Sequence, residues 1–536
     1  MFPKWLSHLA LAGNGGLLAL LLFLITGAVF FQSLGDDFVA WDDDHTFYQN
    51  PHIQGLDAGR IHWMFTNVDY SMRYKPLSWL AYALIFKVNG MDPFGFHFAS
   101  LLFHCLNAVL VFFVLRRLLR LGFVRDNPGP PEEVMSLSAA LGSLLWAVHP
   151  LRVEAVARAT DMTYSQTFFF TLISLWCHLR AVAAVTAGKP AAYWHAGAIT
   201  AFAIAMFSYP FLVAYPVVLI VLDFYPLRRF NPGRDWWRDA AARRVWLEKV
   251  PFILLAGVLV MTFYGRIHPA GAFVETPVDK HFSNLSRMMQ GFYIWAYYLW
   301  KPWFPFNLSS IYTTLIDFNP VTLPFLASAG LITGLSVLLI WKRRAWPLGL
   351  ALWVCHLALL VPALGLTEHP HYASDRYSYV DGLLWPILLA VGSVHLFQRR
   401  NSGLLAAVML LLAIASGALS VAQVQIWRDT PTLFNYMIEK VGDHPVRNGL
   451  LRLLGAWYAD RNRMDDAAAQ FERAITGDPR SAQNRDLLGT VLLQEGRAEE
   501  AAVQFREAIR LAPDDRVARE NLDIIQQQTN AREKTK

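Results

Sequence analysis

The chain has 536 residues, of which 55% are hydrophobic and only 16% are charged, and its formal net charge is +6. Soluble globular proteins carry about 25% charged residues. This deficit, with a mean hydropathy of +0.31, excludes a disordered or fibrous chain and disfavours an ordinary soluble enzyme. The basic residues form short scattered clusters, which is typical of membrane-protein loops, so no nucleic-acid partner is predicted. The three cysteines lie in apolar runs and indicate neither disulfides nor a metal site.

Apolar runs follow one another from near the N-terminus to about residue 425. Because a spanning helix needs about 20 apolar residues, we predict an all-α, polytopic membrane helix bundle with about eleven spans. The predicted spans cover residues 10–32, 94–117, 136–151, 163–184, 191–208, 210–226, 249–265, 320–341, 346–364, 379–397 and 403–424. Two shorter runs, 76–88 and 288–300, are rich in Trp and Tyr, and we interpret them as interfacial or re-entrant helices.

The basic clusters predict the orientation of the chain, because cytosolic loops of membrane proteins collect Lys and Arg. With eleven spans and a cytosolic N-terminus, all the clusters fall on the cytosolic side: 116–120, 228–244, 342–344 and 399–400. Residues 33–93 then form one long extracytoplasmic loop, and the region after the last span also lies outside the cytosol. We predict a transmembrane domain over 1–424 and a second domain over 425–536.

The second domain contains a repeat of 34 residues. The matched pairs are Leu454 and Leu488, Gly455 and Gly489, Ala467 and Ala501, Phe471 and Phe505, Ala474 and Ala508, and Pro479 and Pro513. This period and these residue types are typical of the tetratricopeptide (TPR) repeat, a helix-turn-helix unit. Small residues let paired helices approach closely, and proline ends the second helix. We therefore predict a short extracytoplasmic TPR-repeat domain.

The long outer loop begins with a dense group of carboxylates. Five aspartates lie within residues 36–44, and aromatic and apolar residues interrupt them. A carboxylate held between such groups near a membrane can act as a general base. The alternative interpretation is a hydrated acidic turn or a set of helix caps. The glycine-centred spacing of an EF-hand is absent, so the loop is not predicted to bind calcium.

The rest of this loop and other predicted outer loops are also rich in polar residues. Arg73 and Lys75 precede the run 76–88, where two cations can hold a lipid phosphate or merely extend to the interface. Further polar residues occupy 149–161 and 368–379. The chain has no helical HExxH pair, no P-loop, no dinucleotide glycine fingerprint and no Gly-x-Ser-x-Gly elbow. The polar residues thus converge on the outer face, and an active site there suits a lipid-linked substrate.

Five short motifs occur in order along the chain, ahead of the repeats. They are Phe38-Val39 through Asp42-Asp43 with Asn50-Pro51, Tyr74-Lys75-Pro76-Leu77, His149-Pro150 with Glu154 through Ala157, Arg287 with Trp300 through Tyr312, and Asp375-Arg376-Tyr377 with Tyr379. In this order they resemble the C-type (GT-C) superfamily of integral-membrane glycosyltransferases. More narrowly, the chain is similar to the transmembrane-and-TPR protein O-mannosyltransferases and their bacterial relatives, over nearly its whole length.

The resemblance implies an enzyme that transfers a sugar, with a mannose-like hexose favoured, from a polyprenyl-phosphate carrier to an acceptor hydroxyl. The implied acceptor is a protein Ser or Thr on the extracytoplasmic face, and the anomeric centre is inverted. By position in the motif, Asp42 is the implied base, with Asp43 beside it. An attacking hydroxyl needs such a base, whereas a lipid-phosphate leaving group needs cations. We assign that role to Arg73, Lys75 and Arg376.

Five further residues of these motifs are site candidates: His149, Arg152, Glu154, Asp375 and Tyr379. The resemblance implies no metal and no cofactor, with the lipid-linked sugar as substrate. The sequence also departs from the family. Its Arg-Ala-Asp run usually lies further beyond Glu-Ala-Val than Arg158 to Asp161 does, so we do not carry the family's roles over to those two residues. Val380 stands where a proline is expected, and the repeat array is short.

Two other functions remain open. One is a non-enzymatic membrane scaffold that recruits partners through the TPR repeats. The other is a transporter, for which Asp223 is the clearest ionisable residue within an apolar run. For the enzyme, the repeats either hold an acceptor protein near the active site or stabilise the fold. The compact repeat array and short loops favour a bacterial inner membrane, with the N-terminus cytoplasmic and the TPR domain periplasmic.

Overall fold

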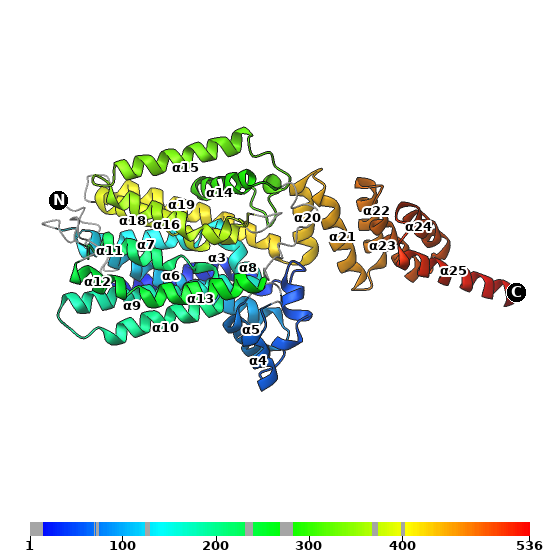
Figure 1. Ribbon diagram of the computed structural model, residues 1–536, viewed down its shortest axis with the longest axis horizontal. Helices are drawn as coiled ribbons and strands as arrows, with labels where there is room; N and C mark the ends of the chain where they lie inside the picture. Colours follow the sequence, from blue (N-terminus) through cyan, green and yellow to red (C-terminus); the bar gives the residue numbers. More distant parts are fainter. Residues whose placement is uncertain are drawn as a thin grey trace. The chain divides into compact units, whose positions relative to one another are not determined.

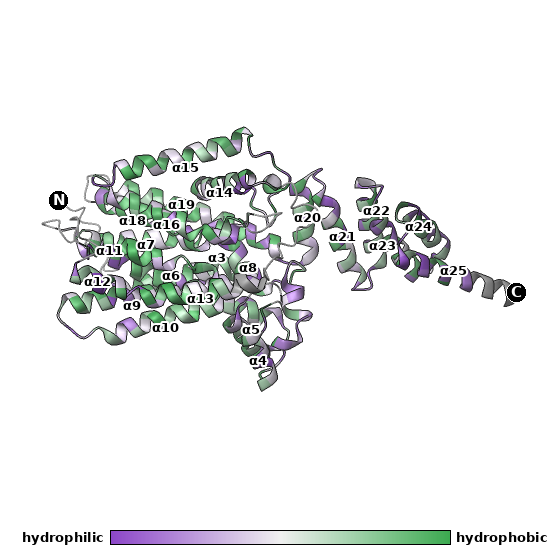
Figure 2. Cartoon of the chain, viewed as in Figure 1, coloured by the Kyte–Doolittle hydropathy of each residue, from purple (hydrophilic) through white to green (hydrophobic). Residues whose placement is uncertain are grey.

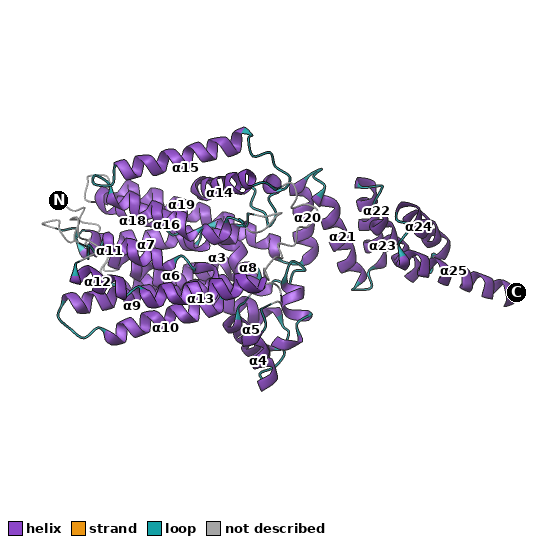
Figure 3. Ribbon diagram, viewed as in Figure 1, coloured by secondary structure: helices purple, strands orange, loops and turns teal. Residues whose placement is uncertain are grey.

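The protein is all-helical and divides into two compact units, Met1–Arg428 and Asp429–Lys536 (Figure 1). The structure is a computed structural model, and it describes residues 14–68, 70, 74–123, 129–230, 239–267, 282–366, 373–397 and 402–535. All the regular secondary structure in these ranges is helical (Figure 3). The predicted all-α class is therefore confirmed.

The first unit is a bundle of apolar helices. Its longer helices are α3 (Gly15–Phe30), α6 (Pro93–Gly122), α7 (Glu132–Ala147), α9 (Met162–Thr186), α10 (Ala192–Ser208), α11 (Tyr215–Phe224), α13 (Val250–Ile267), α14 (Asn284–Trp300), α15 (Leu323–Trp341), α16 (Pro347–Leu359), α18 (Leu384–Phe397) and α19 (Ser402–Val424). Its shorter helices are α4 (Ala58–Thr66), α5 (Pro76–Asn89), α8 (Val153–Ala157), α12 (Ala240–Leu247) and α17 (Ser378–Asp381). Most of the bundle is strongly hydrophobic (Figure 2).

The bundle is a membrane domain. Six helical segments of the described chain are long and apolar enough to cross a bilayer, or up to eight if each of two bent helix pairs is one span. Helices α11 and α16 are shorter apolar helices. Large apolar side chains lie exposed along the bundle, such as Leu323 on α15 and Leu411 on α19, as expected where lipid replaces water. The number of eleven spans stays a prediction.

Helix α6 gives the bundle two distinguishable ends. Its 30 residues make it about 45 Å long at 1.5 Å per residue. Near its start, the ring of Phe96 packs edge-on against Phe38 in the predicted outer loop, with ring centroids 5.3 Å apart. Near its finish, Arg116 and Arg120 both bond Glu132 at the start of α7. We call these the Asp42 end and the Arg120 end.

The predicted long loop, residues 33–93, folds onto the Asp42 end. It contains α4 and α5, and its aromatic side chains form one cluster with Phe96 of α6 and Met162 of α9. Its buried core includes Phe47, Trp79 and Tyr82. The two short aromatic runs form α5 and α14, and neither is among the helices long and apolar enough to span. Their interfacial position stays a prediction.

The second unit consists of α20 (Thr430–Val441), α21 (Val446–Ala459), α22 (Met464–Gly477), α23 (Ala482–Gln494), α24 (Ala498–Leu511) and α25 (Arg516–Thr535). The repeated glycines explain the 34-residue period. A Cβ atom on Gly455 would lie 2.7 Å from the ring of Phe471, and one on Gly489 would lie 2.8 Å from the ring of Phe505. Each glycine thus lets the aromatic ring of the next helix lie against its own backbone, as expected for paired TPR helices.

Candidate active site

Asp42 is an exposed carboxylate held on a strained backbone. Its side chain is 64% exposed, and its φ of 79° lies in the left-handed region that residues other than glycine seldom adopt. The backbone N–H of Thr46 donates to its carbonyl at 2.9 Å. Arg158 Nη1 donates to Asp42 Oδ2 at 3.1 Å. The strained turn therefore presents the carboxylate to solvent while one guanidinium orients it.

The neighbouring Asp43 is turned inward and is completely buried. Its Oδ2 accepts a hydrogen bond from the N–H of Val39 at 3.1 Å, and its Oδ1 accepts from the N–H of Thr160 at 2.9 Å and from the Thr160 hydroxyl. Burial raises the pKa of Asp43 to about 7, although these hydrogen bonds and the charge of Arg158 act to lower it. Asp43 thus fastens the acidic loop to the segment before α9, and Asp42 alone of this pair faces outward.

We expect the substitution Asp43→Asn to remove a pH dependence of stability. Because the folded pKa lies above the ordinary value of 3.8, the folded state holds a proton that the unfolded chain releases. This stabilisation is complete below the unfolded pKa and is lost as pH rises through about 7. Thermal unfolding should be measured between about pH 5 and 8. As pH rises, the unfolding midpoint temperature of the wild type should fall relative to that of Asp43→Asn. A constant difference would contradict the raised pKa.

Arg158 connects Asp42 to the bundle. Its guanidinium makes two bonds to the carboxylate of Asp161, Nε to Oδ2 at 3.0 Å and Nη2 to Oδ1 at 2.7 Å. Its remaining terminal nitrogen, Nη1, reaches Asp42 and the carbonyl of Trp41. Only 2% of the arginine side chain is exposed. Burial opposes the charged form, but Asp161, Asp42 and Glu154 raise the pKa of Arg158 overall, so it remains a cation.

A second ion pair lies beside the first. Glu154 on α8 accepts from Arg376 twice, from the backbone N–H at 2.9 Å and from Nη1 at 2.6 Å. Arg376 Nε also lies 4.0 Å from Asp161 Oδ1, which joins the two pairs into one network. The Nη2 atom of Arg376 makes no hydrogen bond to any residue in the described ranges, and 14% of the side chain is exposed. This guanidinium can therefore accept a further anion.

Asp375 faces a different partner from its neighbour Arg376. The hydroxyl of Tyr312 donates to Asp375 Oδ1 at 2.7 Å. The ammonium of Lys301 lies 5.4 Å from the centre of the Tyr312 ring and donates to the carbonyl of Phe306 at 2.8 Å. Burial lowers the pKa of Lys301, whereas the charge of Asp375 raises it. The loop after α14 thus adds a cation and an aromatic ring next to the network.

Three of the predicted site residues are built into the wall of the bundle. Arg152 bonds the carbonyl and hydroxyl of Ser378 and is 1% exposed. His149 bonds the carbonyl of Pro302 at 2.9 Å. The Tyr379 hydroxyl is buried against His104, at 2.8 Å from its Nδ1. These contacts indicate a supporting role for the three side chains.

The remaining predicted cations are Arg73 and Lys75. Lys75 is buried, and its ammonium lies 4.3 Å from the centre of the Trp79 ring and 5.8 Å from that of Tyr82. Tyr82 in turn donates to the carbonyl of Thr160 at 2.7 Å. Lys75 therefore lies against the aromatic core beneath the acidic loop. Arg73 lies outside the described residues.

Sequence reasoning missed several members of this site. We do not predict roles for Arg158 and Asp161, because their spacing departs from that of the resembled family, yet Arg158 bonds Asp42 and Asp161 bonds Arg158. Thr160, Lys301 and Tyr312 were not among the candidates. One signal was available: an Arg and an Asp three residues apart at the start of an apolar run can pair there and need not be solvated. Within the described ranges, no three His, Cys, Asp or Glu side chains are grouped to hold a metal ion.

These observations define a class of protein. It has a membrane helix bundle with a network of acidic and basic side chains at one end, and a unit of paired helices after it in the sequence. No family model matches the chain. It is 29% identical over 169 residues to a Protein O-mannosyl-transferase of Caenorhabditis elegans, which covers 30% of this chain and 23% of that protein. It is 22% identical over 460 residues to Protein O-mannosyl-transferase TMTC4 of Homo sapiens, which covers 77% of this chain and 60% of that protein.

The chain thus spans less than two thirds of the length of these curated relatives. The predicted resemblance to the transmembrane-and-TPR protein O-mannosyltransferases is confirmed. A solved structure, the crystal structure of the APC/C hetero-tetramer Cut9-Hcn1, matches at 12% identity over 87% of this chain and 92% of that chain. Its TM-score of 0.19 is too low to indicate a shared fold.

Proposed function

We propose that the protein is a glycosyltransferase that moves a hexose, mannose being favoured, from a polyprenyl-phosphate carrier to an acceptor hydroxyl. The observation that carries the proposal is the pairing of an exposed, arginine-oriented carboxylate, Asp42, with a network that ends in Arg376. The carboxylate of Asp42 is suited to take a proton, and the guanidinium of Arg376 is suited to bind a phosphate. The names of the similar proteins support the sugar and the reaction class.

In the proposed reaction the acceptor oxygen attacks the anomeric carbon of the carrier-bound sugar. The new carbon–oxygen bond forms as the bond from that carbon to the carrier phosphate breaks, and attack from the opposite side inverts the centre. The acceptor proton passes to Asp42 as the general base. The phosphate leaves with the bonding electron pair, and Arg376, held by Glu154, stabilises its charge. Arg158 keeps Asp42 oriented until the acceptor binds.

The relatives' names favour a protein acceptor, presented by a Ser or Thr side chain. The second unit would engage such an acceptor, because paired TPR helices offer a groove for peptides. Binding there would raise the local concentration of acceptor hydroxyls. For the cell location we propose a bacterial inner membrane, with the Asp42 end and the repeats on the periplasmic side.

Transfer of radiolabelled mannose from a polyprenyl-phosphate carrier to membrane protein tests the proposal. We expect membranes that contain the full chain to transfer label, and membranes from the same cells without it to transfer none. Polyprenyl-phosphate glucose in a parallel reaction tests the choice of sugar. Absence of transfer from every polyprenyl-phosphate sugar, with partner proteins still captured through the repeats, would replace the enzyme by the scaffold hypothesis.

A further inference from the structure

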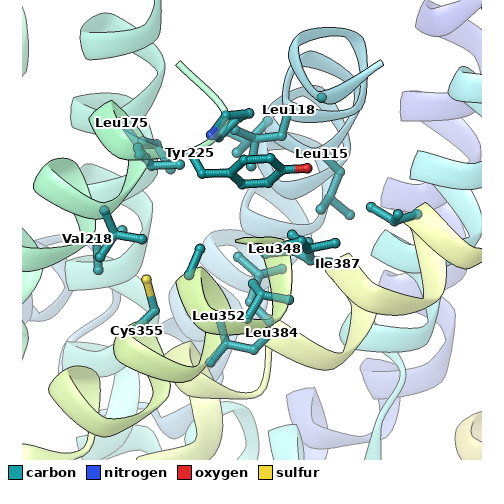
Figure 4. A pocket seen from close by; sticks show the side chains of 18 of the residues that line it. Leu115, Leu118, Leu175, Val218, Tyr225, Leu348, Leu352, Cys355, Leu384 and Ile387 are labelled. Carbon is teal, nitrogen blue, oxygen red and sulfur yellow. The ribbon is translucent and has the colours of Figure 1, made fainter. Parts of the chain in front are cut away.

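A large apolar cavity lies inside the bundle, and its lining includes Val380, directly after Tyr379. Its volume is about 410 Å³, and it lies between α6, α9, α11, α16 and α18. Figure 4 shows side chains from separate helices, among them Leu115 of α6, Leu352 of α16 and Leu384 of α18, converging on one space. None of the described lining residues is an Asp, Glu, Lys or Arg. Such a cavity accepts hydrocarbon, because its walls offer almost no partner to a polar group.

The cavity reaches the Arg120 end of the bundle. It is lined there by Gly122 and Phe123 of the α6 terminus, together with Tyr225 after α11 and His395 on α18. A Cβ atom on Gly122 would lie 4.0 Å from the Tyr225 hydroxyl, and the rings of Phe123 and His395 lie 5.0 Å apart. The ends of α6, α11 and α18 therefore meet around this part of the cavity.

Cations surround this end. The exposed Arg228 lies over the ring of Tyr225, with its guanidinium carbon 5.9 Å from the ring centre. Residues 342–344 are Lys-Arg-Arg, all exposed, and they directly precede Ala345 and Trp346, which line the cavity. The cavity thus combines an apolar interior with a basic rim, which is the pattern of a lipid chain site with an anionic headgroup.

We propose that this cavity holds the acyl chains of an anionic phospholipid, whose phosphate contacts the basic rim at the Arg120 end. Charge complementarity selects this occupant from among the bilayer lipids. The proposed sugar donor would instead place its phosphate at Arg376, near the Asp42 end, whereas the basic rim lies at the Arg120 end of α6. The lipid would act as a fixed part of the bundle, independently of sugar transfer.

Native mass spectrometry of the detergent-purified full chain tests the proposal. The added probes are phosphatidylglycerol, phosphatidylcholine with the same acyl chains, and a polyprenyl phosphate. We expect phosphatidylglycerol to be retained about tenfold or more over phosphatidylcholine, since each Lys or Arg near an anionic headgroup contributes several-fold in affinity. The triple change Arg228→Gln, Arg343→Gln and Arg344→Gln should bring the two phospholipids to equal retention. The triple change Arg447→Gln, Arg461→Gln and Arg473→Gln in the second unit is the matched charge control.

Filling the cavity tests its interior. Leu352→Trp should reduce phosphatidylglycerol retention at least several-fold, because the ring occupies the space of an acyl chain. Leu326→Trp, at a half-exposed position on α15, is the matched control and should change nothing. Val218→Phe replaces Leu352→Trp if that variant does not fold. Equal retention of both phospholipids by the wild type would overturn the proposal. The proposal would also be overturned if the polyprenyl phosphate displaced phosphatidylglycerol from the wild type and this displacement were absent in Leu352→Trp. Neither readout depends on sugar transfer.

Discussion

The substitution Asp42→Asn is expected to lower the rate of sugar transfer by about 10²–10⁴-fold, the usual contribution of a general base. The amide keeps the size of the side chain and its hydrogen bond from Arg158 but cannot take the acceptor proton. Because the side chain is exposed, the fold should be retained. Initial rates of mannose transfer, measured on purified protein in lipid with equal amounts of each variant, check this.

The matched control is Asp44→Asn, which removes the same charge from the same loop two residues later. It should transfer sugar at nearly the wild-type rate. If both variants lose activity equally, the loop acts through its total negative charge, and the assignment of Asp42 is wrong. If Asp42→Asn retains full activity, a different group accepts the proton.

Arg158→Gln is expected to lower the free energy of unfolding by about 3–5 kcal/mol, because it leaves the buried carboxylate of Asp161 with only the 4.0 Å contact to Arg376. It should also abolish transfer, since Asp42 loses the guanidinium that orients it. Thermal unfolding of the purified protein measures the first effect, and the transfer assay measures the second.

The double variant Arg158→Gln with Asp161→Asn separates the two effects. Removing the unpaired charge should restore much of the stability, whereas transfer should stay absent because Asp42 still lacks its guanidinium. Arg447→Gln is the control for loss of an exposed pair and should cost under about 1 kcal/mol. Recovery of activity in the double variant would show that Arg158 acts only on stability.

The parts of the fold that sequence could predict are those set by local patterns. Apolar runs predict helices, and the lipid explains why apolar residues such as Leu411 are exposed. The 34-residue period predicts paired helices because Gly455 and Gly489 must each admit an aromatic ring. Both patterns lie within a single helix or a single helical hairpin, so the local sequence is enough to recognise them. The number of crossings does not follow from these patterns, because apolar runs also form helices as short as α11 and α16.

The candidate site depends on contacts between distant segments, and sequence reasoning could supply only part of it. The acidic loop identified Asp42 and Asp43 together, but only the structure separates an exposed carboxylate from a buried one. Tyr379 lies in a matched motif, yet its hydroxyl bonds His104 on α6, 275 residues away. Polarity in a short motif indicates that a side chain needs a partner and does not say whether that partner is a substrate or another helix.

The bond between Asp43 and Thr160 joins residues that are 117 positions apart. At about 5–20 residues per second, synthesis of the intervening chain takes roughly 6–25 s. During this interval the carboxyl of Asp43 is hydrated and the acidic loop has nothing to anchor it. The turn that presents Asp42 can therefore lock only after the start of α9 has been made. A nascent chain shorter than this holds no preorganised centre, so the growing polypeptide is inert at least until α3, α6 and α7 are complete and α9 has begun.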